Sequence, residues 1–199
     1  MSSFFLAAAA VGALLLGVWV LRPLIGLEQP NYTLVSRDGA LDIRDYAPLT
    51  VASTQLTGRY EQSSSRGFRV IAGYIFGGNQ QSERLAMTAP VLVGNPSAPS
   101  YPMAFVMPSA AVRRGLPTPS SDALSLQEQR WGRVAVWSFG GWVSEARVAE
   151  AWQQMRQALA AKGLQAERFD WIAQYSPPTL PPPFRRNELW VMLDATPES

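Results

Sequence analysis

The order of the predicted strands and helices repeats once along the chain, and this repeat constrains the fold more than any other feature of the sequence. The two halves align at several points: Leu41 with Leu124, Ile43 with Leu126, Val51 with Val134, Ala52 with Ala135 and Gly58 with Gly141. Each half is predicted to hold one hairpin, one helix and two further strands. Two such halves would merge their sheets into one distorted β-barrel with both helices packed against it, which is an α+β architecture.

Turn residues and a change of hydrophobic period divide the first half. Alternating apolar residues at 32–36 and 41–46 predict a β-hairpin around Arg37-Asp38-Gly39, and a strand at 49–54 follows. The period then becomes helical, with a serine at 63, 64 or 65 as the predicted N-cap. The apolar face of this helix holds Phe68, Ile71, Ala72 and Ile75, and Gly77-Gly78-Asn79 ends it. Strands are predicted at 84–93 and 103–107.

The second half follows the same plan. Strands are predicted at 124–129 and 133–139, and Ser144 caps a second helix. The apolar face of this helix holds Val148, Trp152, Met155 and Leu159, and Lys162-Gly163 ends it. Strands at 165–173 and 188–193 complete the predicted fold.

Residues 4–21 form an uninterrupted uncharged and largely apolar run. As a helix rising about 1.5 Å per residue, the run would be about 27 Å long and would just span a bilayer core. We favour a retained membrane anchor at residues 1–22 over a signal sequence, because no basic residue precedes the run and no A-x-A cleavage site follows it. Residues 23–31 then form a linker. Arg22 alone does not decide the side of the membrane, which stays open.

The composition removes several classes of site. The chain has no histidine and no cysteine, which excludes the usual zinc sites, Ser-His-Asp triads, disulfides and Cys-ligated iron–sulfur clusters. Lys and Arg together number 17 against 15 acidic residues, and they are scattered, so we expect no nucleic-acid partner. We also find no carboxylate pair suited to catalysis and no metal site.

Three segments resemble the SOUL haem-binding protein family. Residues 68–91, FRVIAGYIFGGNQQSERLAMTAPV, resemble the family's helix followed by an Ala-Met-Thr-Ala-Pro-Val strand. Tyr175-Ser-Pro-Pro and the later sequence RRNELWV resemble its closing segment, and residues 32–46 match as well. The resemblance implies a domain at 32–195 with a duplicated fold, related to effector-binding domains of the GyrI type. It also implies a haem or other tetrapyrrole in a shallow apolar pocket. Only family members that bind without a histidine ligand can serve as a guide here.

Haem requires an apolar slot, cationic donors for two propionates and, optionally, an axial ligand. The candidate binding residues are Arg66 and Arg69 for the propionates, Phe68 and Ile71 for the macrocycle, Met87 as a conceivable ligand, and Tyr175 beside the Pro-rich loop as an opposite wall. Ordinary roles stay open for each: core packing for Ile71 and Met87, and solvated surface for the two arginines. The polar run at 185–188 has two interpretations, a ligand contact or a buried Arg–Glu pair that holds the sheet together.

The predicted function is a membrane-tethered carrier or buffer of haem or another tetrapyrrole. Binding is expected to be non-covalent and reversible, without a strong axial ligand and without enzymatic activity. The expected partners are the tetrapyrrole and, through a single N-terminal helix, the lipid bilayer; protein partners are unknown. One alternative is a small hydrolase or tetrapyrrole-processing enzyme of the related effector-binding fold. Another is a module whose groove receives an amphipathic peptide.

Overall fold

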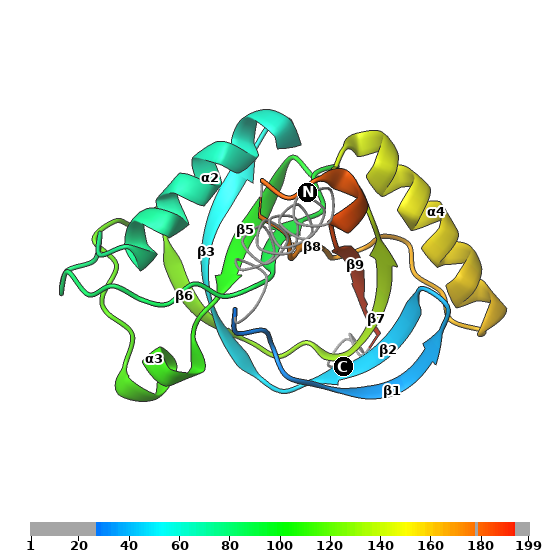
Figure 1. The fold of residues 1–199 in the computed structure, drawn as a ribbon, viewed down its shortest axis with the longest axis horizontal. Coiled ribbons are helices and arrows are strands. Elements are labelled where there is room, and N and C mark those ends of the chain that lie inside the picture. The colour runs from blue at the N-terminus through cyan, green and yellow to red at the C-terminus, as the bar shows by residue number, and fades with distance from the viewer. Residues whose placement is uncertain (1–26, 178, 194–199) are drawn as a thin grey trace, which may run out of the picture.

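The computed structural model describes residues 27–177 and 179–193. Nine antiparallel strands form one strongly curved sheet, and the two long helices lie on its convex side (Figure 1). The strands are β1 (Tyr32–Asp38), β2 (Leu41–Tyr46), β3 (Leu49–Thr57), β4 (Val91–Gly94), β5 (Ser100–Val106), β6 (Ser125–Gln129), β7 (Gly132–Phe139), β8 (Trp171–Gln174) and β9 (Asn187–Met192). The helices are α2 (Tyr60–Ile75), α3 (Ser109–Arg114) and α4 (Glu145–Ala161), with a 3-10 turn η2 (Pro182–Phe184).

The order of strands in the sheet reflects the predicted duplication of the fold. The order is β1-β2-β7-β9-β8-β4-β5-β3-β6, with β8 and β4 paired at its centre. On one side of this central pair, β4 is followed by β5, β3 and β6. On the other side, β8 is followed by β9, β7 and β2. The two series correspond element by element, so the repeat and the α+β class are confirmed.

One detail of the predicted pairing is wrong. The hairpin expected in the second half, between the strands at 124–129 and 133–139, does not form: β7 pairs with β2 of the first half, and β6 pairs with β3 of the first half. The links Ala47-Pro48 and Arg130-Trp131 contain none of the Gly or Asn residues that close a tight hairpin. The strands on either side of each link therefore pair with strands of the other half. Only β1 and β2 form the predicted hairpin, around Gly39 at φ +58°.

The predicted barrel does not close. The edge strands β1 and β6 are not paired with each other in the described part of the chain. Large rings occupy the concave side: Trp131, which follows β6, contacts Tyr46 at 5.9 Å and Trp190 at 5.1 Å between ring centroids. These buried rings belong to one core cluster on the concave side of the sheet.

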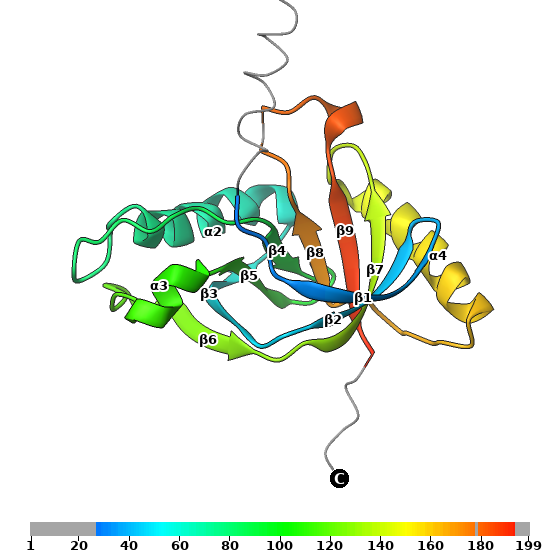
Figure 2. The ribbon, with the colours of Figure 1, turned by 60° about the horizontal axis from the view of Figure 1, so that its bottom comes forward.

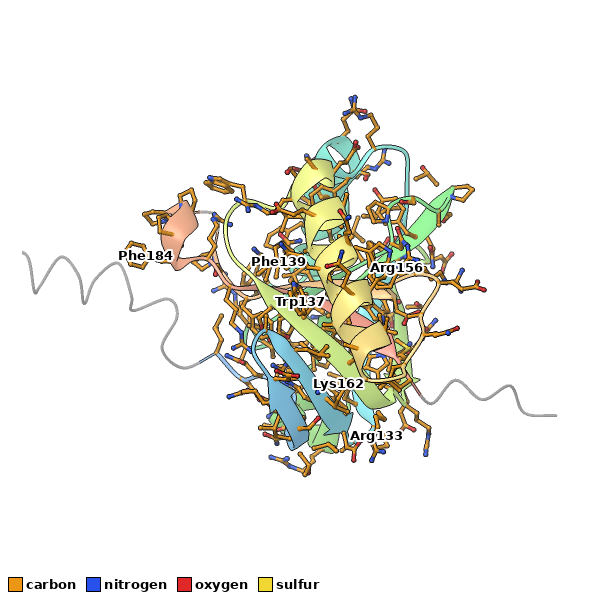
Figure 3. All side chains as sticks on the ribbon, turned by 90° about the vertical axis from the view of Figure 1, so that its right-hand side faces the viewer. Arg133, Trp137, Phe139, Arg156, Lys162 and Phe184 are labelled. Carbon is orange, nitrogen blue, oxygen red and sulfur yellow. The ribbon has the colours of Figure 1, made fainter. Side chains whose placement is uncertain are left out.

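Each long helix covers one half of the convex face. Ile71 and Ile75 of α2 pack on Leu56, Met103 and Phe105 of β3 and β5. Helix α4 packs in the same way on β2, β7, β8 and β9 through four buried side chains, namely Val148, Ala151, Met155 and Leu159. In Figure 3, Trp137 and Phe139 of β7 lie beside this helix.

The helix boundaries differ in part from the prediction. The cap of α4 is confirmed, because Ser144 Oγ accepts a hydrogen bond from the backbone N–H of Arg147 at 3.3 Å. Helix α2 instead begins at Tyr60 without a side-chain cap, and Ser63 is buried within it. The short helix α3 was not predicted, and the predicted strands 84–93 and 165–173 are regular only at their C-terminal ends.

The predicted anchor at residues 1–22 lies outside the described residues, as do residues 23–26 of the linker. Within residues 27–177 and 179–193, no helix is both long and apolar enough to cross a membrane.

Candidate functional site

Strand β9 places a carboxylate at the centre of the concave face. Side chains alternate along the strand, so Leu189 and Val191 face α4 while Glu188 and Trp190 face the concave side. Both Glu188 and Trp190 are fully buried. A charged residue at this position requires partners, since an unpaired buried charge is very costly.

Five donors satisfy the Glu188 carboxylate. Oε1 accepts hydrogen bonds from Arg186 Nη2 at 2.6 Å and Arg44 Nη2 at 3.1 Å. Oε2 accepts from Arg44 Nη1 at 3.1 Å, from the hydroxyl of Tyr175 at 2.8 Å and from Trp190 Nε1 at 2.8 Å. The Arg–Glu pair predicted at 185–188 is confirmed only in part, because Arg186 is 44% exposed while Glu188 is buried. The buried arginine partner of Glu188 is Arg44, 144 residues away in sequence.

The network extends along β2 to the edge of the sheet. Asp42 accepts from Arg44 Nη2 at 2.7 Å and from the more exposed Arg37 at 2.7 Å. The Arg44 guanidinium also lies over the Tyr32 ring, 4.4 Å from its centroid. This cluster joins three guanidinium groups, of Arg37, Arg44 and Arg186, to the two carboxylates of Asp42 and Glu188, which leaves one positive charge in excess.

Burial and charge together set the protonation states in this cluster. Burial disfavours the charge on Glu188, but the positive charges of Arg44 and Arg186 outweigh it and hold the pKa of this carboxyl below its ordinary value. Burial raises the pKa of the Tyr175 phenol well above its ordinary value, and the negative charge of Glu188 adds to the effect. Glu188 is therefore ionised and has no proton to give as a general acid, while Tyr175 is a neutral donor rather than a phenolate.

A different surface lies along α2, where Phe68 is 40% exposed. The Phe68 ring is tilted against that of Phe105, 5.4 Å away between centroids. Arg66 and Arg69 are exposed within one turn of it, and neither forms an ion pair with an acidic side chain that the structure describes. This α2 flank, defined by Arg66, Phe68 and Arg69, combines an open aromatic face with two available cations.

The remaining predicted residues have different surroundings. Ile71 is fully buried in the core beneath the helix, and Met87 is half-buried against the same cluster. Phe105 pairs with Val91 and Val91 with Gln174, so the α2 flank and the end of β8 are two strands apart, about 10 Å. The side chain of Tyr175, the next residue, turns to the concave face. Arg66, Phe68 and Arg69 thus lie within one turn of α2, and Tyr175 lies apart from them.

An apolar cavity of about 170 Å³ lies between the first turns of α2 and α4. Its lining includes Tyr60, Val148, Trp152, Phe169 and Ile172. Pockets for drug-sized ligands are typically about 300–1,000 Å³, so this cavity is too small for a tetrapyrrole macrocycle. A tetrapyrrole therefore suits an open surface such as the α2 flank better than this cavity.

The comparisons of this sequence with a family model and with curated proteins agree with each other. The family model described as SOUL heme-binding protein matches residues 27–192. Heme-binding protein 1 of Xenopus laevis is 26% identical over 176 residues, which cover 83% of this chain and 92% of that protein. The protein of the same name from Xenopus tropicalis matches with the same identity and coverage.

Two solved structures share the fold at low identity. The C-terminal domain of EcmrR has a TM-score of 0.53 at 9% identity and covers 81% of this chain and 96% of its own. A hydrolase from Listeria innocua has a TM-score of 0.50 at 13% identity, and the match covers 79% of this chain and 93% of the hydrolase. These likenesses show the fold alone. Since the family model spans most of the chain, from the first described residue to the last strand, the chain belongs to the SOUL heme-binding protein family.

Proposed function

We propose that this protein binds haem or another tetrapyrrole on the α2 flank, reversibly and without a covalent bond. The observation that carries the proposal is an exposed phenyl ring on α2 with two exposed arginines within one helical turn of it, in a chain of this family. The face of Phe68 and the apolar surface around it can receive a macrocycle. Arg66 and Arg69 can pair with its propionates, since a guanidinium matches the geometry of a carboxylate.

The iron is expected to receive no strong axial ligand from the chain. His and Cys are absent from the sequence. The hydroxyl of Tyr175 donates a hydrogen bond to Glu188, and Met87 packs against the core beneath α2. Affinity then comes from burial of the macrocycle: about 300 Å² at roughly 25 cal/mol per Å² gives several kcal/mol before the costs of association. Binding of this strength is reversible, as a carrier or buffer requires.

The apolar run at residues 4–21 supports a tether to the membrane. Haem partitions into lipid, and a tethered domain meets it there at a high effective concentration. We therefore propose a carrier or buffer held at the bilayer surface.

The first prediction compares haemin with metal-free protoporphyrin. The two ligands should bind within about tenfold of each other, a difference of ~1.4 kcal/mol or less, because the iron adds little. Titrations followed by the Soret band and by tryptophan fluorescence measure both affinities. Haemin binding a hundredfold more tightly would reveal a true axial ligand and contradict the proposed site.

The second prediction concerns the two arginines of the α2 flank. Arg66→Glu with Arg69→Glu should weaken both tetrapyrroles alike, by roughly 10-fold to 30-fold, because two exposed ion pairs are lost and replaced by repulsion. The matched control is Arg113→Glu with Arg156→Glu, which makes the same change in net charge at two exposed arginines on α3 and α4. Equal weakening by the two double variants would place the ligand elsewhere.

A further inference from the structure

We propose that the loop between β8 and β9 is a second membrane contact, whose aromatic tip enters the interfacial layer of the bilayer. The proposal rests on the membrane tether proposed above and adds the orientation of the domain. The contact surface is the aromatic rim, defined here as Trp142, Pro181, Pro182, Pro183 and Phe184.

The aromatic rim exposes large apolar side chains. Phe184 is 67% exposed and Trp142 53% exposed, and Pro181, Pro182 and Pro183 at the start of η2 are exposed as well. Figure 3 shows Phe184 at the outer end of η2, pointing away from the rest of the domain. Aromatic rings of this kind are enriched where proteins meet the headgroup layer of a membrane.

The loop is held in place rather than loose. Arg185 Nε donates to the carbonyl of Leu180 at 2.9 Å, and Nη2 donates to that of Pro177 at 3.0 Å. The same guanidinium lies 3.5 Å from the centroid of the Trp142 ring, and Leu180 is buried beneath the loop. The fold therefore fixes the aromatic rim in an exposed position, at little further cost in conformational entropy when it meets a partner.

The rim lies at the end of the domain where the chain arrives from its N-terminal segment. Gln174, the last residue of β8, pairs with Val91 at the start of β4. Just before β4, the backbone carbonyl of Glu28 accepts a hydrogen bond from Ala89 N–H at 2.9 Å. Figure 2 shows the first described residues and η2 at the same end of the sheet.

The length of chain outside the structure limits the distance to the bilayer. Between the apolar run at 4–21 and the first described residue there are five residues, which span at most about 17 Å when fully extended. An anchored domain must then hold this end close to the membrane surface.

The absence of cysteine from the chain allows a direct test. The full-length variant Phe184→Cys, labelled with nitrobenzoxadiazole, is reconstituted into vesicles of phosphatidylcholine and phosphatidylglycerol. Pro183→Cys is a second position on the rim, and Arg156→Cys, exposed on α4, is the control (Figure 3). We expect the emission of both rim labels to shift to shorter wavelength and to be quenched by doxyl-labelled lipid. The emission of the label at position 156 should stay at the wavelength typical of water and should not be quenched.

Each other outcome overturns the proposal and identifies its cause. If the protein stays with the vesicles but the emission of the rim labels is that of an aqueous environment, the N-terminal tether is supported and the rim does not contact the membrane. A blue shift without quenching by doxyl lipid would mean that protein, not lipid, covers the rim. If the protein does not remain with the vesicles at all, the tether itself fails and the membrane contact falls with it.

Discussion

Replacing Glu188 with alanine is expected to lower the free energy of unfolding by about 3–5 kcal/mol, because it leaves Arg44 buried without its main partner. Arg44 and Glu188 are both fully buried, and their pairing joins β2 to β9. The loss also removes the acceptor of Tyr175 and Trp190. Chemical denaturation of the full-length protein in a mild detergent, followed by tryptophan fluorescence, measures the change.

The control for this substitution is Glu150→Ala. Glu150 pairs with Arg147 at 3.5 Å on the exposed face of α4, and such a pair contributes only about 0–1 kcal/mol. If Glu188→Ala cost no more than this control, the concave network would contribute little to the stability of the fold.

The same carboxylate makes stability depend on pH. The folded pKa of Glu188 lies below its ordinary value of 4.5, so its contribution is fully present above that pH and is lost as the pH falls through the folded value. Glu188→Gln removes this titration while keeping the size of the side chain. The stability of the variant should therefore fall less steeply in acid than that of the wild-type protein.

Much of the fold could be predicted because the repeat and the local signals agree. Ser144 before α4 and the glycines after α2 mark helix ends through local chemistry, and the paired halves imply a merged sheet. The exchange of β2 and β6 between the halves could not be predicted in this way. Strand pairing depends on contacts between distant residues, and the short links at Ala47-Pro48 and Arg130-Trp131 indicate only that no tight hairpin forms.

The α2 flank could be predicted from the sequence, but most of the Glu188 network could not. Arg66 and Arg69 are three residues apart, so helical spacing alone places them on adjoining positions, and Phe68 lies within the same turn. The Glu188 network joins residues from opposite ends of the chain, and its full set of partners follows only from the strand register. A signal for part of it exists in Asp42, Arg44 and Tyr46, three polar or amphipathic residues at alternate positions of one strand. That alternation indicates a polar face, which the structure shows to be buried.

Two arginines near the middle of the apolar run are expected to release the protein from membranes. Val11→Arg with Leu14→Arg should disfavour insertion by about 6 kcal/mol in total, since each arginine near the centre of a membrane helix costs roughly 3 kcal/mol. The wild-type protein should stay in the membrane pellet after a carbonate wash, and the double variant should appear in the supernatant. Val11→Leu with Leu14→Ile keeps the run apolar and should remain in the pellet.

The identity of the N-terminus decides between a retained anchor and a cleaved leader. A retained anchor requires that the membrane-bound protein still carry residues 4–21, as mass spectrometry of the purified protein can show. A mature chain that begins between residues 22 and 30 and stays in the supernatant would contradict the anchor. The α2 flank would keep its chemistry in that case, because Arg66, Phe68 and Arg69 depend on the packing of α2 against β3 and β5 and not on the N-terminal segment. Tetrapyrrole binding and membrane attachment are therefore separable, and the carrier role at the bilayer requires both.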